Sequence, residues 1–127
     1  MLQQAVLVWA EIPVADMTRA VDFYRKHLGL TFKQETMGGM EMAVVEQQEQ
    51  QGAGMALVKC DMMTPSMQGS LVYLQVGKPV SRAVAILEQG GVEVLLPSMA
   101  IKDGECGYIA IFRDSEGNRV GLWSMDA

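Results

Sequence analysis

The chain has 127 residues, a length typical of one domain, and half of its residues are hydrophobic. Its formal net charge of −5 and its scattered lysines and arginines argue against a nucleic-acid partner, because a negative surface repels phosphate backbones. No apolar run approaches the roughly 18 residues of a membrane span, and no basic start of a secretory signal is present, so we expect a cytoplasmic protein that contacts no membrane.

The first half of the chain predicts a strand, a helix and three further strands. Residues 7–14 are rich in β-forming side chains, and Asp16 is a good N-cap for the helix that follows. The helix shows apolar residues at the i, i+3, i+4, i+7 spacing and ends at Gly29. Three strands are then expected, at residues 30–34, 40–47 and 55–60, the last two joined by a loop rich in Gln, Glu and Gly.

The second half repeats this order. Residues 70–76 form the expected strand, Pro79 opens a helix, and Gly90 and Gly91 end it. Three strands are again expected, at residues 92–96, 107–113 and 118–124. The tripeptide Arg-Ala-Val occurs at the same place in both helices, at residues 19–21 and 82–84. We therefore predict a single α+β domain of two βαβββ modules, about residues 1–62 and 68–127.

One face of each strand should pack under a helix, and the other face points elsewhere. In three strands the second face mixes aromatic, polar and charged side chains, which suits the wall of a small-molecule pocket. Packing between the two modules is the alternative interpretation. The predicted ligand-binding residues are Trp9, Glu11, Leu71, Tyr73, Gln75, Arg119 and Trp123.

Several short motifs together resemble the vicinal oxygen chelate superfamily, which includes glyoxalase I, bleomycin-resistance proteins and extradiol dioxygenases. The N-terminal carriers are residues 11–16, 20–24 and 28–29, and the C-terminal ones are 107–108 and 112–118. The resemblance covers nearly the whole chain. It implies paired modules whose curled mixed sheets frame a cleft, with the helices on the outer faces, and a homodimer that completes clefts across a two-fold axis.

Metal-using members of that superfamily hold a divalent cation with His, Glu or Gln side chains on two strands of each module. The corresponding positions in this chain fall on Trp9, on residues 55–57, on Leu71 and on Gly121, none of which supplies such a donor. The only histidine, His27, is expected to be a solvated residue in the last turn of the first helix. We therefore predict no metal ion and no cofactor.

Three functions are compatible with these observations. The first is metal-independent binding of a small, partly apolar or aromatic molecule, in a sequestration or resistance-type role. The second is a glyoxalase-like lyase or isomerase, or a dioxygenase, with a non-standard site. There Glu11, if buried against Trp9 and Trp123, is the candidate catalytic residue, whereas a salt bridge to Arg119 would make it structural. The third is an interaction module without a small ligand.

Overall fold

The computed structural model describes residues 1–47 and 52–127. The first module consists of β1 (Trp9–Pro13), α1 (Met17–Leu28), β2 (Phe32–Met37), β3 (Met40–Val45) and β4 (Gly54–Lys59). The second consists of β5 (Tyr73–Leu74), α2 (Val80–Gln89), β6 (Val94–Ala100), a 3₁₀ turn (Lys102–Gly104), β7 (Tyr108–Arg113) and β8 (Arg119–Ser124). Residues 48–51, in the Gln- and Glu-rich loop expected between β3 and β4, lie outside the described residues.

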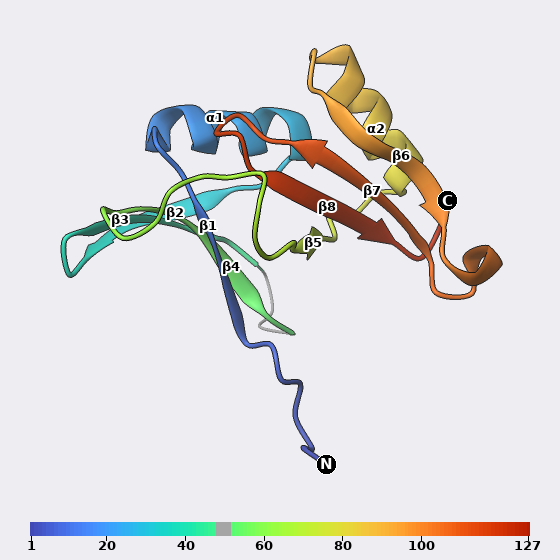
Figure 1. Ribbon diagram of the computed structural model, residues 1–127, viewed down its shortest axis with the longest axis horizontal. Helices are drawn as coiled ribbons and strands as arrows, with labels where there is room; N and C mark the ends of the chain where they lie inside the picture. The colour runs from blue at the N-terminus through green and yellow to red at the C-terminus, as the bar shows by residue number, and fades with distance from the viewer. Residues whose placement is uncertain (48–51) are drawn as a thin grey trace.

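Each module forms one four-stranded mixed sheet. The strand orders are β1-β4-β3-β2 and β5-β8-β7-β6, and in each sheet the first two strands are parallel while the other neighbours are antiparallel (Figure 1). Parallel pairing of the first and last strands of a module needs a crossover connection, which the helix and two intervening strands supply. The predicted α+β fold of two βαβββ modules is confirmed, with sheets that are open and uncurled.

Helix α1 begins and ends at the residues that the sequence predicts. The carboxylate of Asp16 accepts a hydrogen bond from the backbone N–H of Arg19 at 3.0 Å, as an N-cap does. Gly29 takes the left-handed conformation, with φ of 70°, and its N–H binds back to the last turn of the helix. The apolar stripe is buried at Met17, Ala20 and Leu28. These local signals fix where α1 lies relative to β1.

Strand β5 is much shorter than residues 70–76, the range expected from the sequence. Only Tyr73 and Leu74 pair with β8, and one further hydrogen bond joins Gly121 N–H to the carbonyl of Val72 at 2.8 Å. Among the described strands, β5 lies at the edge of its sheet and pairs only with β8, and the positive φ of Gly77 turns the chain away toward α2. Most of this segment is therefore extended chain rather than sheet.

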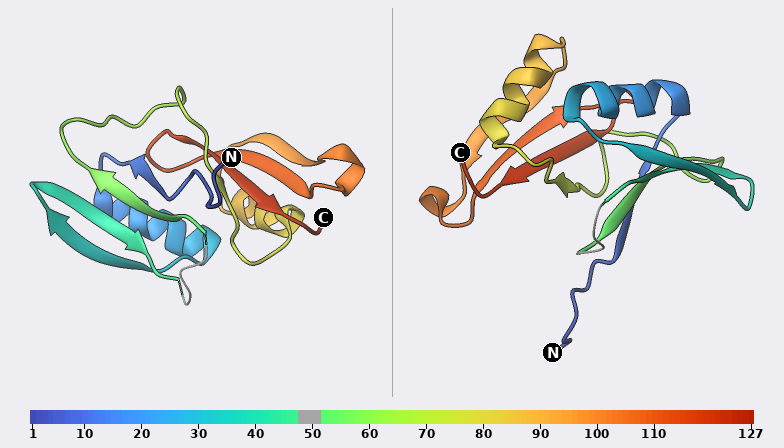
Figure 2. Two further views of the ribbon diagram at one scale, coloured as in Figure 1. Left: turned by 90° about the horizontal axis from the view of Figure 1, so that it is seen from below. Right: turned by 180° about the vertical axis from the view of Figure 1, so that it is seen from behind.

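The two helices cover one face of the two sheets and contact each other, while the sheets diverge from the place where the helices meet (Figure 2). One buried cluster spans both modules. Phe23 of α1 stacks on Phe112 of β7 with ring centroids 6.0 Å apart, and Tyr24 meets the same ring edge-on. Among residues 1–47 and 52–127, no helix covers the opposite face of either sheet, and we call this the helix-free face.

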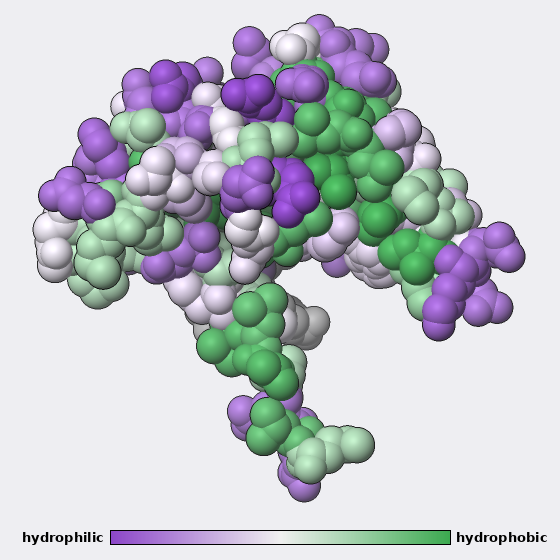
Figure 3. All heavy atoms as spheres, in the orientation of Figure 1, coloured by the Kyte–Doolittle hydropathy of each residue, from purple (hydrophilic) through white to green (hydrophobic). Residues whose placement is uncertain are grey.

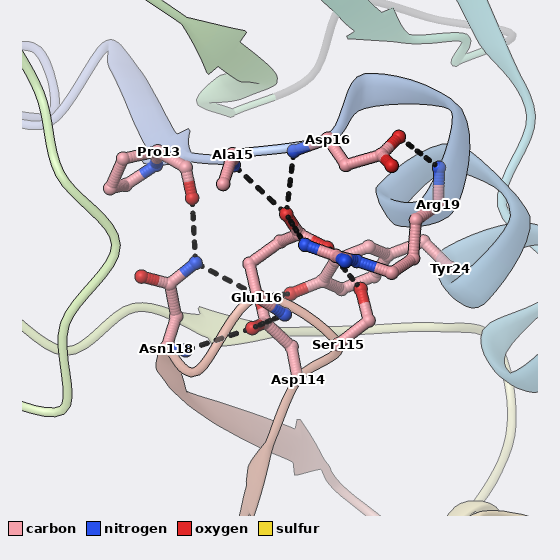
Figure 4. Close-up of polar contacts among 9 residues, drawn as sticks. All are labelled: Pro13, Ala15, Asp16, Arg19, Tyr24, Asp114, Ser115, Glu116 and Asn118. Atoms are coloured by element: carbon pink, nitrogen blue, oxygen red, sulfur yellow. Dashed lines mark hydrogen bonds and ion pairs between the residues drawn. The ribbon is translucent and has the colours of Figure 1, made fainter.

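Polar contacts hold the turn between β7 and β8 against the start of α1 (Figure 4). One carboxylate oxygen of Glu116 accepts hydrogen bonds from the backbone N–H groups of Ala15 and Asp16, both at 2.8 Å. Its other oxygen pairs with the Arg19 guanidinium at 2.7 Å. Burial raises the pKa of Glu116, but the hydrogen bonds from Arg19, Asp16, Ser115 and Ala15 outweigh it and lower the pKa from 4.5 to about 2.

The same turn carries a second, buried group of contacts. Asp114 is only 5% exposed and accepts hydrogen bonds from the Tyr24 hydroxyl at 2.7 Å and from the Asn118 backbone N–H at 2.8 Å. Burial, reinforced by the nearby Asp114, raises the pKa of Tyr24 well above its usual value. The Asn118 side chain donates to the carbonyl of Pro13 at 2.7 Å. We call Arg19, Tyr24, Asp114, Glu116 and Asn118 the inter-module clasp, because they fix the end of β1 beside the start of β8.

Candidate functional site

The predicted alternation of side chains along β1 is present. Trp9 and Glu11 point to the helix-free face of the first sheet, and the Trp9 indole N–H donates to a Glu11 carboxylate oxygen at 3.3 Å. Ile12, of opposite parity, is buried in the core beneath the helices. In the second sheet Tyr73 and Trp123 occupy the helix-free face, whereas Leu74 packs against the core.

Each aromatic residue predicted to line the pocket packs against a glycine. A methyl group at Gly54 would stand 2.8 Å from the ring of Trp9, and one at Gly121 would overlap the ring of Tyr73. The ring of Trp123 approaches Gly107 in the same way. Because glycine has no Cβ, the rings can lie close to the backbone of their sheets.

The largest of the described pockets lies between the first sheet and the β5 segment, with a volume of about 580 Å³. Leu71, Tyr73 and Gln75, three of the predicted ligand-binding residues, line it together. Its remaining wall is mostly apolar and includes Leu7, Ala10, Leu30, Val45, Met55 and Leu74. We call it the β5 pocket. Ala10 and Met55 come from the first module and are not among the predicted ligand-binding residues, because they have the parity of core positions.

The other predicted residues lie outside the β5 pocket. Trp9 borders an adjoining pocket of about 360 Å³ that shares Gly54 with the first. Glu11 and Arg119 line a third pocket, of about 220 Å³, between β1, β8 and the inter-module linker. Trp123 lines none of these three pockets, and its indole donates to the Cys106 carbonyl at 2.8 Å. The seven residues therefore form neighbouring sites rather than one.

Glu11 is exposed rather than buried between the two tryptophans. Within residues 1–47 and 52–127 it forms no ion pair with Arg119, whose guanidinium instead donates to the Gly69 carbonyl at 3.3 Å. The described residues therefore do not form the salt bridge between Glu11 and Arg119 that was the alternative interpretation. The catalytic role of Glu11 stays a prediction, because its side chain is exposed in the single chain, whereas that role would require burial.

Comparison with models of protein families assigns the chain to one of them. The family model described as "Glyoxalase/Bleomycin resistance protein/Dioxygenase superfamily" matches residues 6–122. The chain belongs to this superfamily. This confirms the family that the sequence motifs indicate. A comparison with curated proteins found no match.

Several solved structures share the fold over nearly their full length. A member from Sphaerobacter thermophilus is 25% identical, with 96% of this chain and 98% of that one covered and a TM-score of 0.69. A glyoxalase/bleomycin resistance protein from Streptomyces sp. CB03234 is 26% identical, with coverages of 93% and 99% and a TM-score of 0.66. TnmS3, an antibiotic binding protein from the same organism, is 22% identical, with coverages of 97% and 98% and a TM-score of 0.66.

The positions where metal-using members of the superfamily place their ligands do not fit a divalent cation here. Trp9, Ala56 and Gly121 lie at these positions on the helix-free faces, and Leu71 lines the β5 pocket. None of these side chains, nor those of Met55 and Leu57 beside Ala56, provides an anionic or imidazole donor. In the described part of the chain, no three His, Cys, Asp or Glu side chains cluster as a metal site requires.

His27 is less solvated than the sequence analysis expected. Its ring packs edge-on against Phe23, with centroids 4.9 Å apart, and lies directly over Gly90 at the end of α2. Burial, with the nearby Lys26, lowers the pKa of His27 below its usual value. It therefore contributes to the contact between α1 and α2 and lies away from the three pockets described above.

Neither helix has the length and apolarity to cross a bilayer within residues 1–47 and 52–127.

Proposed function

We propose that this superfamily member binds a small, partly apolar or aromatic molecule in the β5 pocket without a metal ion, in a sequestration or resistance-type role. The observation that carries the proposal is the β5 pocket itself. Its volume of about 580 Å³ lies in the range of roughly 300–1,000 Å³ that is usual for ligand sites. Metal independence rests on the side chains at the four ligand positions, which offer no donors.

The wall of the β5 pocket suits this class of ligand. Most of it is apolar, which favours an apolar molecule by removing its surface from water. Tyr73 adds an aromatic ring on which a planar or cationic group can stack. Gln75 adds an amide that can donate and accept hydrogen bonds, which would orient the ligand.

Two relatives support a binding role rather than a particular reaction. One is titled a glyoxalase/bleomycin resistance protein and another an antibiotic binding protein. Their identities to this chain are 26% and 22%, so the ligand class is a proposal for this chain and its chemistry must come from its own pocket. The cytoplasmic location expected from the sequence belongs to the same proposal.

We further propose that the protein is a homodimer. Apolar surface gathers over the second sheet and along the segment that precedes β1 (Figure 3). Tyr73 and Met99 are 45% and 47% exposed, and Ile109, Ile111 and Trp123 are partly exposed on the same helix-free face. Exposed apolar side chains gathered on one face are typical of association sites in soluble proteins. A second copy that covered it would also enclose the aromatic side chains.

Ligand binding can be tested with bleomycin and with the apolar fluorescent anion 1-anilinonaphthalene-8-sulfonate as probes. We expect Tyr73→Ala to weaken the binding of at least one of them about tenfold, which corresponds to about 1.4 kcal/mol. Met125→Ala, at an exposed apolar residue beyond β8, is the matched control and should leave affinity unchanged. Equal affinities in the wild type and Tyr73→Ala, or binding lost on dialysis against EDTA, would contradict the proposal.

A further inference from the structure

The third pocket differs in chemistry from the β5 pocket. Its volume is about 220 Å³, and three segments enclose it: residues 11–13 of β1, residues 64–70 of the linker and residues 118–120 at the start of β8. Four linker side chains on its wall are polar, and they alternate along the chain: Thr64, Ser66, Gln68 and Ser70. We call it the linker pocket. It can accept a ligand of its own, separate from the one proposed for the β5 pocket.

One wall of the linker pocket carries a positive charge with an unused donor. The Nε–H of Arg119 is buried and has no hydrogen-bond partner among the residues that the structure describes. The guanidinium makes one long hydrogen bond, from Nη2 to the Gly69 carbonyl at 3.3 Å. A buried donor without an acceptor costs roughly 1–3 kcal/mol, so native proteins rarely leave one unsatisfied. Because this atom is buried, the Arg119 side chain would have to shift to present its Nε–H to a ligand in the pocket, which would supply the missing acceptor.

Another wall of the linker pocket carries a negative charge. Glu11 is held by the Trp9 indole N–H at 3.3 Å, and an ionised carboxylate has room for further donors. Glu11 and Arg119 share the pocket, yet no ion pair joins them in the described residues. A simple anion at Arg119 would be repelled by Glu11, and a simple cation at Glu11 would be repelled by Arg119. A molecule that carries both charges complements both walls.

The linker wall is held in place before any ligand binds. The side-chain oxygen of Asn118 accepts a hydrogen bond from the Ser66 backbone N–H at 3.0 Å. The Ser66 hydroxyl in turn accepts one from the Gln68 N–H at 2.9 Å. Because Asn118 also belongs to the inter-module clasp, the linker, β1 and β8 are fixed relative to one another. A preformed wall lowers the entropy cost of binding a small molecule.

We propose that the linker pocket binds a small zwitterion of amino-acid size, with its carboxylate on Arg119 and its ammonium group on Glu11. A water molecule occupies about 30 Å³ in the liquid, so a pocket of about 220 Å³ has room for a molecule of several heavy atoms. The guanidinium offers two N–H groups to a carboxylate, and a charge-assisted pair of this kind is stronger than a neutral hydrogen bond. This inference goes beyond the proposed function and does not depend on the β5 pocket.

The indole N–H signals of the two tryptophans provide a local test by two-dimensional ¹H–¹⁵N NMR of the full chain. Trp9 donates to Glu11 at the pocket, whereas Trp123 donates to the Cys106 carbonyl and serves as the internal control. The probes are glycine, L-serine and 4-aminobutyrate, with acetate and methylammonium as single-charge comparisons. We expect a saturable shift of the Trp9 signal with at least one zwitterion, at least tenfold tighter than with either single charge, and no shift at Trp123.

Substitutions separate the linker pocket from other sites. Arg119→Gln and Glu11→Gln should each weaken the Trp9 response to the zwitterion at least tenfold. Arg113→Gln removes a charge from an exposed residue that pairs with Glu93 at 3.8 Å, and it should leave the response unchanged. An unmoved Trp123 signal in each variant shows that the fold is retained.

Three results would overturn the inference. A Trp9 signal that no probe moves at concentrations of tens of millimolar would mean that the linker pocket binds no zwitterion. An equal response to acetate would mean a simple anion site. An undiminished response in Arg119→Gln would place the binding elsewhere. None of these results bears on the β5 pocket, which the Tyr73→Ala experiment tests.

Discussion

Asp114 is a buried carboxylate of the inter-module clasp. Tyr24→Phe removes one hydrogen bond to this buried carboxylate and leaves its contacts with Asn118 in place. We expect a loss of about 1–2 kcal/mol in the free energy of unfolding, as for a buried hydrogen bond to a charged group. Urea denaturation followed by circular dichroism measures it. Tyr73→Phe, on the exposed face of β5, is the control. Equal stabilities of the wild type and Tyr24→Phe would show that the bond contributes little.

Glu116 should make stability depend on acid pH. Its pKa in the folded protein is about 2, below its ordinary value of 4.5 in the unfolded chain, so the folded state favours the ionised carboxylate. The stabilisation is complete above the unfolded pKa and is lost as the pH falls toward 2. We therefore expect Glu116→Gln to be less stable than the wild type at neutral pH. The difference in unfolding free energy should shrink as the pH is lowered through this window, and a constant difference would argue against the ion pair as its cause.

The residues of the helix-free face and those of the inter-module clasp differ in how well the sequence predicts them. The period-2 alternation of a strand identifies the face that carries Trp9, Glu11 and Tyr73, because parity is a local property. The partners of Asp114 and Glu116 are not local: Tyr24 lies 90 positions away from Asp114 and Arg19 lies 97 positions from Glu116. The sequence shows a turn and a family motif at these residues, but no pattern in the sequence predicts which residues the turn contacts.

At the scale of elements, β5 is the strand whose position depends most on a single glycine. In Gly121→Ala the new methyl group would overlap the Tyr73 ring, which must move or push β5 away from β8. Overpacking of this kind costs about 1–3 kcal/mol. The unfolding free energies of Gly121→Ala, Tyr73→Ala and the double variant measure the coupling. We expect the double variant to lose less unfolding free energy than the sum of the two single losses. Additive losses would mean that the ring does not touch this position.

Strong local signals predict most of the elements. Asp16 and Gly29 set the limits of α1, and the turn at residues 114–118 separates β7 from β8 as expected. The largest departure is β5, where β-rich residues predict a strand over 70–76 but only Tyr73 and Leu74 form a ladder. Strand β6 also differs, because it runs over Val94–Ala100 rather than the expected 92–96. Propensity shows that a segment prefers to be extended, whereas a ladder needs a neighbour in register. That neighbour is set by the tertiary fold.

At the scale of the whole molecule, the pockets depend on how the modules meet. The β5 pocket combines Met55 of β4 with Tyr73 of β5, and the linker pocket combines Glu11 with Arg119, so each draws on both halves of the chain. The sequence predicts the two modules through their internal repeat. It does not predict which of the seven candidate residues share a pocket, because their distances follow from the long-range contacts of the clasp and of the common core.

Association of two copies is the prediction that concerns the whole surface. We expect light scattering at micromolar concentration to give about twice the chain mass of 13.9 kDa. Ile109→Lys places a charge on the helix-free face of the second sheet, opposite Trp123, and should shift the protein to monomers, because burying an unpaired charge is costly. Glu88→Lys, on the exposed side of α2, is the control and should stay dimeric. A wild type that is monomeric, or an Ile109→Lys variant that remains dimeric, would show that this face is not the interface.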